Sequence, residues 1–189
     1  MSANSANLYL CGMRGTGKTA IGRVLASELE VPFLDLDLEM DRLLGYPHAR
    51  LVAERGWLAF RELEYDICKR LARREKSLIA LGGGTVRYAW NRDLLRGTGF
   101  FVLLTAPVAE LARRLRPEER PALTRAASLE EELRAVWEQS EEVYRRTADF
   151  VYDTAGKSVA DAARELLPVA RGYLENGCPP GDASCPVHR

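Results

Sequence analysis

The stretch from Gly12 to Thr19 has the residue types and spacing of a loop that binds phosphate. It reads Gly-Met-Arg-Gly-Thr-Gly-Lys-Thr and matches G-x-x-x-x-G-K-[ST] at every position. Glycines let the backbone wrap round a phosphate with its N–H groups pointing inward, and the N-terminus of the following helix adds partial positive charge. In this pattern Lys18 reaches the outer phosphates and the Thr19 hydroxyl can coordinate Mg²⁺. We therefore predict a nucleoside triphosphate site with these contact residues: Gly12, Gly15, Thr16, Gly17, Lys18, Thr19 and Ala20.

Two aspartates, Asp35 and Asp37, come at the end of a short apolar run that begins at Phe33. At this spacing one carboxylate can face the metal and the other an acceptor alcohol, and phosphoryl transfer needs both. Asp37 could instead simply cap the helix that follows it. The neighbouring phosphate loop favours the catalytic interpretation, in which Asp35 serves the metal with Thr19 and Asp37 serves the acceptor.

The elements that must position these residues alternate along the chain. Short apolar runs predict five strands, at 7–11, 33–35, 77–81, 99–105 and 150–152. Helical spacing of apolar residues predicts helices between and after them, at 18–30, 39–44, 49–54, 57–74 and 159–174. Continuous apolar strands separated by helices indicate a parallel sheet buried on both faces. We therefore predict an α/β three-layer sandwich with a central parallel, five-stranded sheet, whose ligands bind at the carboxyl ends of the strands.

The composition is that of a globular protein with a sizeable core. Of 189 residues, 47% are hydrophobic, and 27 Lys and Arg balance 27 Asp and Glu, so the formal net charge is zero. This balance argues against a nucleic-acid binder, which would carry an excess of basic residues. The length predicts one domain over residues 1–176. A flexible tail is predicted over 177–189, where the composition changes to Pro, Gly, Asp and Ser.

Neither a membrane protein nor a cysteine-based metal centre is expected. The longest uncharged apolar stretch, Gly97 to Ala109, is too short to span a bilayer, and residues 1–7 show no secretory signal. We expect a cytoplasmic protein with reduced thiols, in which Cys11 and Cys68 are small buried side chains. Three residues of the tail are soft ligands, but their spacing matches no standard zinc pattern: Cys178, Cys185 and His188.

The segment from Arg116 to Arg125 is charged and contains two prolines. It could be an ordinary exposed loop or a mobile lid that closes over the nucleotide. Its position and its arginines favour a lid over about 114–127, which would bring Arg113, Arg116 or Arg120 onto ATP.

Five sequence blocks together resemble shikimate kinases. They are GMRGTGKTAIGRVLA, FLDLD, FRELE (60–64), LGGGTV (81–86) and RPAL (120–123), in the order and spacing of that family over roughly residues 7–170. The resemblance implies a P-loop fold like that of nucleoside monophosphate kinases. It also implies MgATP-dependent phosphorylation of a small metabolite with a hydroxyl and a carboxylate, in a monomeric cytoplasmic enzyme of aromatic amino-acid biosynthesis. The acceptor would be shikimate and the product shikimate 3-phosphate.

The resemblance also assigns residues to the acceptor. Asp37 matches the acid that holds the acceptor hydroxyls and acts as base, and Arg61 matches the arginine that pairs with the substrate carboxylate. A planar guanidinium suits this task because it can donate two parallel hydrogen bonds. Glu64 matches the acid that orients Arg61. The turn of Gly82, Gly83 and Gly84 matches a segment whose backbone approaches the substrate ring.

On the nucleotide side, Lys18 neutralises the phosphates and Asp35 matches a residue on the water shell of the metal. Arg120 matches the lid arginine that reaches the transferring phosphate, and Arg113 matches the arginine that stacks over adenine. With Lys18 and Asp37, Arg120 completes the predicted catalytic set.

Two departures from the family fall on the acceptor side. Ser140 stands where a second substrate-binding arginine is expected, and Trp57 follows Gly56 where a glutamate is usual. Loss of one charge-assisted hydrogen bond costs about 1.5–3 kcal/mol and would weaken shikimate binding roughly tenfold to a hundredfold. Another arginine could compensate, the candidates being Arg134, Arg145 and Arg146.

Two alternatives therefore stay open. The first is a kinase for another acceptor, such as homoserine or a sugar acid, whose smaller pocket Trp57 would help to form. The second is a degenerate kinase that serves as a nucleotide-binding module, which the presence of Lys18, Asp35, Asp37 and Arg120 disfavours.

Overall fold

Five parallel strands form the central sheet of the computed structural model, which describes residues 6–115 and 128–176. The strand order is β2-β3-β1-β4-β5, and every neighbouring pair is parallel. The strands are β1 (Asn7–Cys11), β2 (Phe33–Asp35), β3 (Leu78–Ala80), β4 (Gly99–Thr105) and β5 (Phe150–Asp153). The predicted five-stranded α/β fold is confirmed, with strand bounds within one residue of those expected.

The register of the sheet aligns three chemically important positions. Leu10 of β1 pairs with Ala80 of β3, which in turn pairs with Asp35 of β2. Because the strands are parallel, all three continue from these paired residues toward the same edge of the sheet. Two residues further on they reach Gly12, Asp37 and Gly82.

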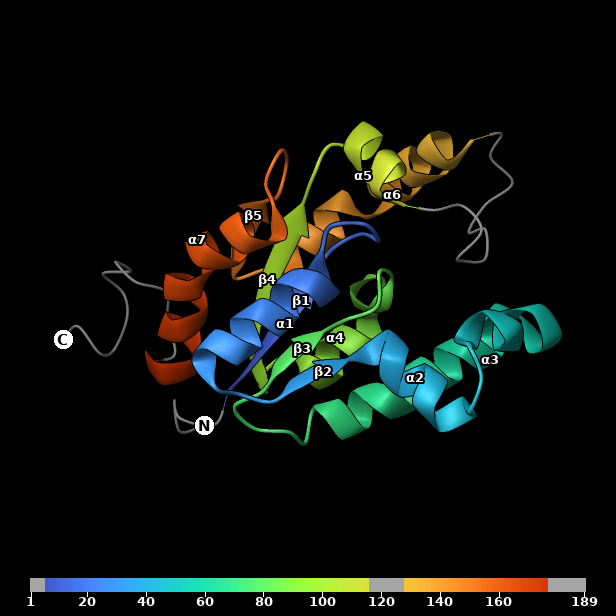
Figure 1. Cartoon of the computed structure of the whole chain (residues 1–189). Helices are drawn as coiled ribbons and strands as arrows, with labels where there is room; N and C mark the ends of the chain where they lie inside the picture. Colours follow the sequence, from blue (N-terminus) through green and yellow to red (C-terminus); the bar gives the residue numbers. More distant parts are fainter. Residues whose placement is uncertain (1–5, 116–127, 177–189) are drawn as a thin grey trace.

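Two helices cover one face of the sheet: α1 (Lys18–Leu29) and α7 (Val159–Arg171). Figure 1 shows them together on the same side of the strands. The contact is close enough that α1 needs glycine at position 22, since a Cβ there would lie 2.6 Å from the Phe33 ring. The chain continues from α7 into a π-helical turn, η4 (Gly172–Asn176).

The other face packs under the remaining helices through the core around Tyr9, Ile79, Phe101 and Leu103. These elements are α2 (Leu36–Leu44), α3 (His48–Leu71), the 3₁₀ turn η2 (Thr85–Arg87), α4 (Ala89–Leu95), α5 (Val108–Arg114) and α6 (Leu129–Thr147). Figure 1 shows α3 leaving the sheet on the β2 side and α6 lying on the β4 side, so the two flank the carboxyl edge of the strands.

Several element boundaries differ from the predictions for local reasons. Helix α2 begins at Leu36, earlier than the predicted 39, because the Asp35 side chain caps it by accepting from the Leu38 N–H. Asp35 therefore holds the cap position that had been considered for Asp37. The expected break at Gly56 is confirmed, where φ is 78° and ψ is 176° within α3.

The edge strand β5 also corrects an expectation. Its residues alternate between half-buried and exposed, and Val151 is 41% exposed, so this strand is not buried on both faces as the central ones are. Cys11 and Cys68 are buried free thiols, as expected, and burial raises the pKa of Cys11 to about 12. Within 6–115 and 128–176, no helix combines the length and hydrophobicity needed to cross a bilayer. Most of the predicted lid, with Arg116 and Arg120, and the whole predicted tail lie outside the described residues.

Candidate active site

The phosphate loop follows β1 directly and is shaped by its contact with β4. Gly12 has a φ of 132°, and a Cβ there would lie 2.3 Å from the carbonyl oxygen of Leu104, so only glycine fits. The Lys18 ammonium donates hydrogen bonds to the carbonyl oxygens of Gly12 and Met13, each at 2.9 Å. Lys18 thus lies across its own loop, 9% exposed, with its charge at the N-terminus of α1.

Thr19 and Asp35 meet beside this loop. The Thr19 hydroxyl donates to Asp35 Oδ2 at 2.6 Å, while Asp35 Oδ1 accepts the Leu38 N–H that begins α2. Asp35 is only 8% exposed. A hydroxyl and a carboxylate are the hard oxygen donors that Mg²⁺ prefers, so these side chains fit the predicted metal role.

Arg114 anchors α5 to the far side of the phosphate loop. Its guanidinium donates to the carbonyl oxygen of Thr154 at 2.8 Å and to that of Gly15 at 3.4 Å. Arg113, the residue predicted to stack over adenine, is exposed and donates back to the carbonyl oxygen of Ala109 in its own helix. The arginine placed against the phosphate loop is therefore Arg114, which sequence reasoning had missed.

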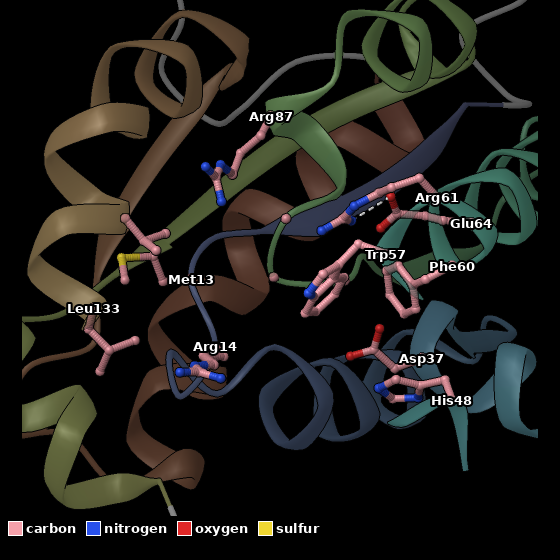
Figure 2. A pocket seen from close by; sticks show the side chains of 14 residues that line it. Met13, Arg14, Asp37, His48, Trp57, Phe60, Arg61, Glu64, Arg87 and Leu133 are labelled. Atoms are coloured by element: carbon pink, nitrogen blue, oxygen red, sulfur yellow. Dashed lines mark hydrogen bonds and ion pairs between the residues drawn. The ribbon is translucent and has the colours of Figure 1, made fainter. Parts of the chain in front are cut away.

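A cleft that is partly open to solvent lies next to the phosphate loop. Its lining comes from the loop, α2, α3, the glycine turn after β3, η2 and α6, and Figure 2 shows these side chains. The lining residues are Met13, Arg14, Asp37, His48, Trp57, Phe60, Arg61, Glu64, Gly82, Gly83, Gly84, Arg87, Leu133 and Val136.

Asp37 projects into this cleft from the first turn of α2. Its Oδ1 atom is so near the glycine turn that a Cβ at Gly82 would lie 2.9 Å from it. A Cβ at Gly83 would lie 3.1 Å from the backbone nitrogen of Arg14 in the phosphate loop. The acidic side chain, the turn and the loop therefore meet at one edge, as the sheet register requires.

Arg61 is held in the cleft by a buried acid. Its Nη1 donates to Glu64 Oε2 at 2.8 Å, and Glu64 is fully buried. Glu64 Oε1 also accepts from the Thr85 hydroxyl at 2.8 Å, and Asn91 donates to Oε2 at 3.3 Å. Such a network fixes a guanidinium in one orientation and leaves its other edge for a ligand.

Aromatic rings enclose the same guanidinium. The Cζ atom of Arg61 lies 4.5 Å from the ring centre of Tyr88, 4.8 Å from Phe60 and 5.4 Å from Trp57. Within this enclosure a Cβ at Gly84 would lie 3.2 Å from Arg61 Nη2. The glycine turn thus gives Arg61 room, and the Arg61 side chain is only 13% exposed among the rings.

Comparison with known proteins shows to which family the chain is similar. The family model described as "Shikimate kinase" matches residues 14–171. A shikimate kinase of Nitratidesulfovibrio vulgaris is 44% identical over 135 residues, covering 69% of this chain and 77% of its own. One from Geobacter metallireducens is 37% identical over 169 residues, covering 89% of this chain and 92% of its own.

This chain belongs to the shikimate kinase family. A solved structure agrees: "Shikimate kinase from Acinetobacter baumannii in complex with shikimate" superposes with a TM-score of 0.81 at 33% identity, covering 86% of this chain and 90% of its own. The resemblance read from the five sequence blocks is confirmed.

The acceptor side of this shikimate kinase family member contains an ion pair that sequence reasoning missed. Arg14 of the phosphate loop pairs with Glu132 of α6, and both side chains are largely buried. The pair connects the phosphate loop to the helix that follows the predicted lid. No local pattern signals it, because 118 residues separate the partners.

None of the arginines proposed to replace the one expected at Ser140 lines the cleft. Each forms an exposed i,i+4 ion pair on α6, and the pairs are Arg134–Glu130, Arg145–Glu141 and Arg146–Glu142. Arg145 and Arg146 therefore belong to the solvated end of α6 and do not compensate for Ser140. The cleft instead contains Arg87, which had not been singled out.

Replacement of Glu64 by alanine tests the buried network. We expect Glu64→Ala to lower the free energy of unfolding by about 3–5 kcal/mol, because it leaves the Arg61 charge buried without its partner. Urea denaturation followed by circular dichroism measures the change. The matched control is Glu62→Ala, an exposed position two residues away on α3, which should change the free energy by less than about 0.5 kcal/mol. Equal stability of the two variants would contradict the structural role of Glu64.

Proposed function

We propose that this protein transfers the γ-phosphoryl group of MgATP to shikimate, giving shikimate 3-phosphate. The observation that carries the proposal is the cleft in which Asp37 and Arg61 lie beside the phosphate loop, in a chain of the shikimate kinase family. Such a cleft supplies one group for a hydroxyl and one for a carboxylate. The relative solved with shikimate bound supports the same acceptor.

On the nucleotide side, the loop amides and Lys18 would neutralise the phosphates. Thr19 and Asp35 would hold Mg²⁺, directly or through its water shell, and the ion would supply positive charge that neutralises the phosphates. We propose that Arg114 lies along the nucleotide, since it already contacts the phosphate loop. Roles for Arg113 and for Arg120, which lies outside the described residues, remain predictions.

On the acceptor side, Asp37 would accept a hydrogen bond from the reacting hydroxyl and orient its oxygen toward the γ-phosphate. Arg61 would hold the carboxylate with the edge of its guanidinium that does not face Glu64. Most of the catalytic power in this arrangement comes from positioning and electrostatics.

An acceptor comparison tests the proposal. Purified protein with ATP and MgCl₂ is given shikimate, homoserine or gluconate, and ADP release is followed by a coupled assay. We expect turnover with shikimate and at least a hundredfold lower kcat/KM with the other two. Preferred turnover of homoserine or gluconate would establish the changed-acceptor alternative, and no turnover with any of them would favour the nucleotide-binding module.

We further propose that the enzyme acts in the cytoplasm as a monomer, as the family resemblance implies. Size-exclusion chromatography with light scattering tests the second point, and a mass near the 21.1 kDa of one chain is expected.

A further inference from the structure

One face of α6 looks toward the glycine turn. Val136 lines the cleft, and the hydroxyl of Tyr144 donates to the carbonyl oxygen of Gly83. Ser140 lies between them, one helical turn from each, and therefore on the same face. Its buried hydroxyl donates back to the Val136 carbonyl oxygen of the same helix at 2.6 Å, so this position offers the cleft no positive charge.

Arg87 brings a guanidinium to this region from another element. It ends η2, which follows the glycine turn directly and packs against α6. Figure 2 shows the Arg61 and Arg87 side chains among those around the cleft, Arg61 from α3 and Arg87 from the turn. Burial raises the pKa of Tyr144, and the charges of Arg87 and Arg61 both oppose that rise, which places both charges near the same hydroxyl.

The charges that line the cleft are otherwise matched by protein partners. Arg14 pairs with Glu132, and Arg61 pairs with Glu64. The Arg87 guanidinium makes no hydrogen bond or ion pair with any residue in the described ranges. A half-buried cation in a ligand cleft gains most from an anionic ligand when no carboxylate of the protein already holds it.

We propose that Arg87 is the second carboxylate-binding arginine of this enzyme and supplies the positive charge that Ser140 lacks. Arg61 and Arg87 would together hold the acceptor carboxylate on either side of the glycine turn. The inference rests on the proposed function, because the carboxylate is that of shikimate. It also explains how a chain with serine at position 140 keeps two cations for one carboxylate.

Replacement of Arg87 by alanine tests the inference with steady-state kinetics. We expect Arg87→Ala to raise KM for shikimate roughly tenfold to a hundredfold and to leave KM for ATP unchanged. The preference for shikimate over its methyl ester, as the ratio of kcat/KM values, should fall by a similar factor, because the ester lacks the charge. Arg87→Lys keeps the charge without the planar guanidinium, so its KM for shikimate should lie between those of the unaltered protein and Arg87→Ala. Arg134→Ala is the matched control, since this exposed arginine pairs only with Glu130 on the outside of α6.

The outcomes separate this inference from the function on which it rests. An unchanged KM for shikimate in Arg87→Ala, or an equal loss for shikimate and its methyl ester, would overturn the role of Arg87. Failure of the unaltered protein to phosphorylate shikimate would instead reject the proposed function.

Discussion

Asp37→Asn should lower kcat for shikimate phosphorylation by roughly 10²–10⁴-fold, the usual contribution of a positioned general acid–base group. Asparagine has the same shape, so the first turn of α2 and the contact with Gly82 should persist. It cannot accept the proton of the reacting hydroxyl. ADP release under saturating shikimate and ATP measures the effect, and KM for ATP should stay constant.

The control for Asp37 is Glu39→Gln, two residues further along α2. Glu39 forms an ion pair with Arg42 on the surface of the helix. Its replacement should leave kcat within about twofold, since Glu39 is not among the residues that line the cleft and exposed ion pairs contribute at most about 1 kcal/mol to stability. A kcat in Asp37→Asn within tenfold of the unaltered protein would exclude Asp37 as the group that orients and deprotonates the hydroxyl.

Lys18→Met is expected to produce the second large effect, a fall in kcat of roughly 10²–10³-fold. That is the typical cost of removing one preorganised charge or donor from a transition state. Methionine keeps the length and apolar stem of lysine, so α1 should still form. The same ADP assay gives kcat, and the change should leave KM for shikimate nearly unaltered because Lys18 lies across the nucleotide loop.

Lys69→Met serves as the control for Lys18, because Lys69 pairs with Asp66 on the exposed side of α3. A thermal melt of both variants separates chemistry from folding, since Lys18 also bonds two loop carbonyl oxygens. If Lys18→Met melted like the unaltered protein and kept its kcat, the phosphate loop would not be the site of transfer.

Features encoded by short stretches of sequence could be predicted. The strands follow from continuous apolar runs, and the phosphate loop follows from its glycines and Lys18, because each depends on residues close together in the chain. The rule that ligands bind at the carboxyl ends of parallel strands predicted the edge of the sheet where Asp37 and the glycine turn meet, though not the contact between them. The start of α2 was missed because Asp35 can both end a strand and cap a helix, and sequence alone does not decide between these.

Features that depend on packing between distant segments could not be predicted. Arg14 meets Glu132, Glu64 gathers Thr85 and Asn91, and no local spacing encodes these pairs. To replace the arginine missing at Ser140, the sequence suggested arginines of the same helix. The structure shows that these arginines form surface ion pairs instead. Arg87 comes from another element, the turn η2 after β3, and only the packing of η2 against α6 reveals its position.

The carboxylate of Asp35 serves two neighbours with its two oxygens, Thr19 through one and the start of α2 through the other. A substitution at this position would therefore disturb the proposed magnesium site and the helix that carries Asp37 at the same time. Among substitutions, Thr19→Val separates the proposed magnesium site from acceptor alignment, because it removes the hydroxyl while the cap on α2 remains. Experiments that vary the ion rather than the protein, such as a titration with Mn²⁺ in place of Mg²⁺, change the metal without disturbing α2.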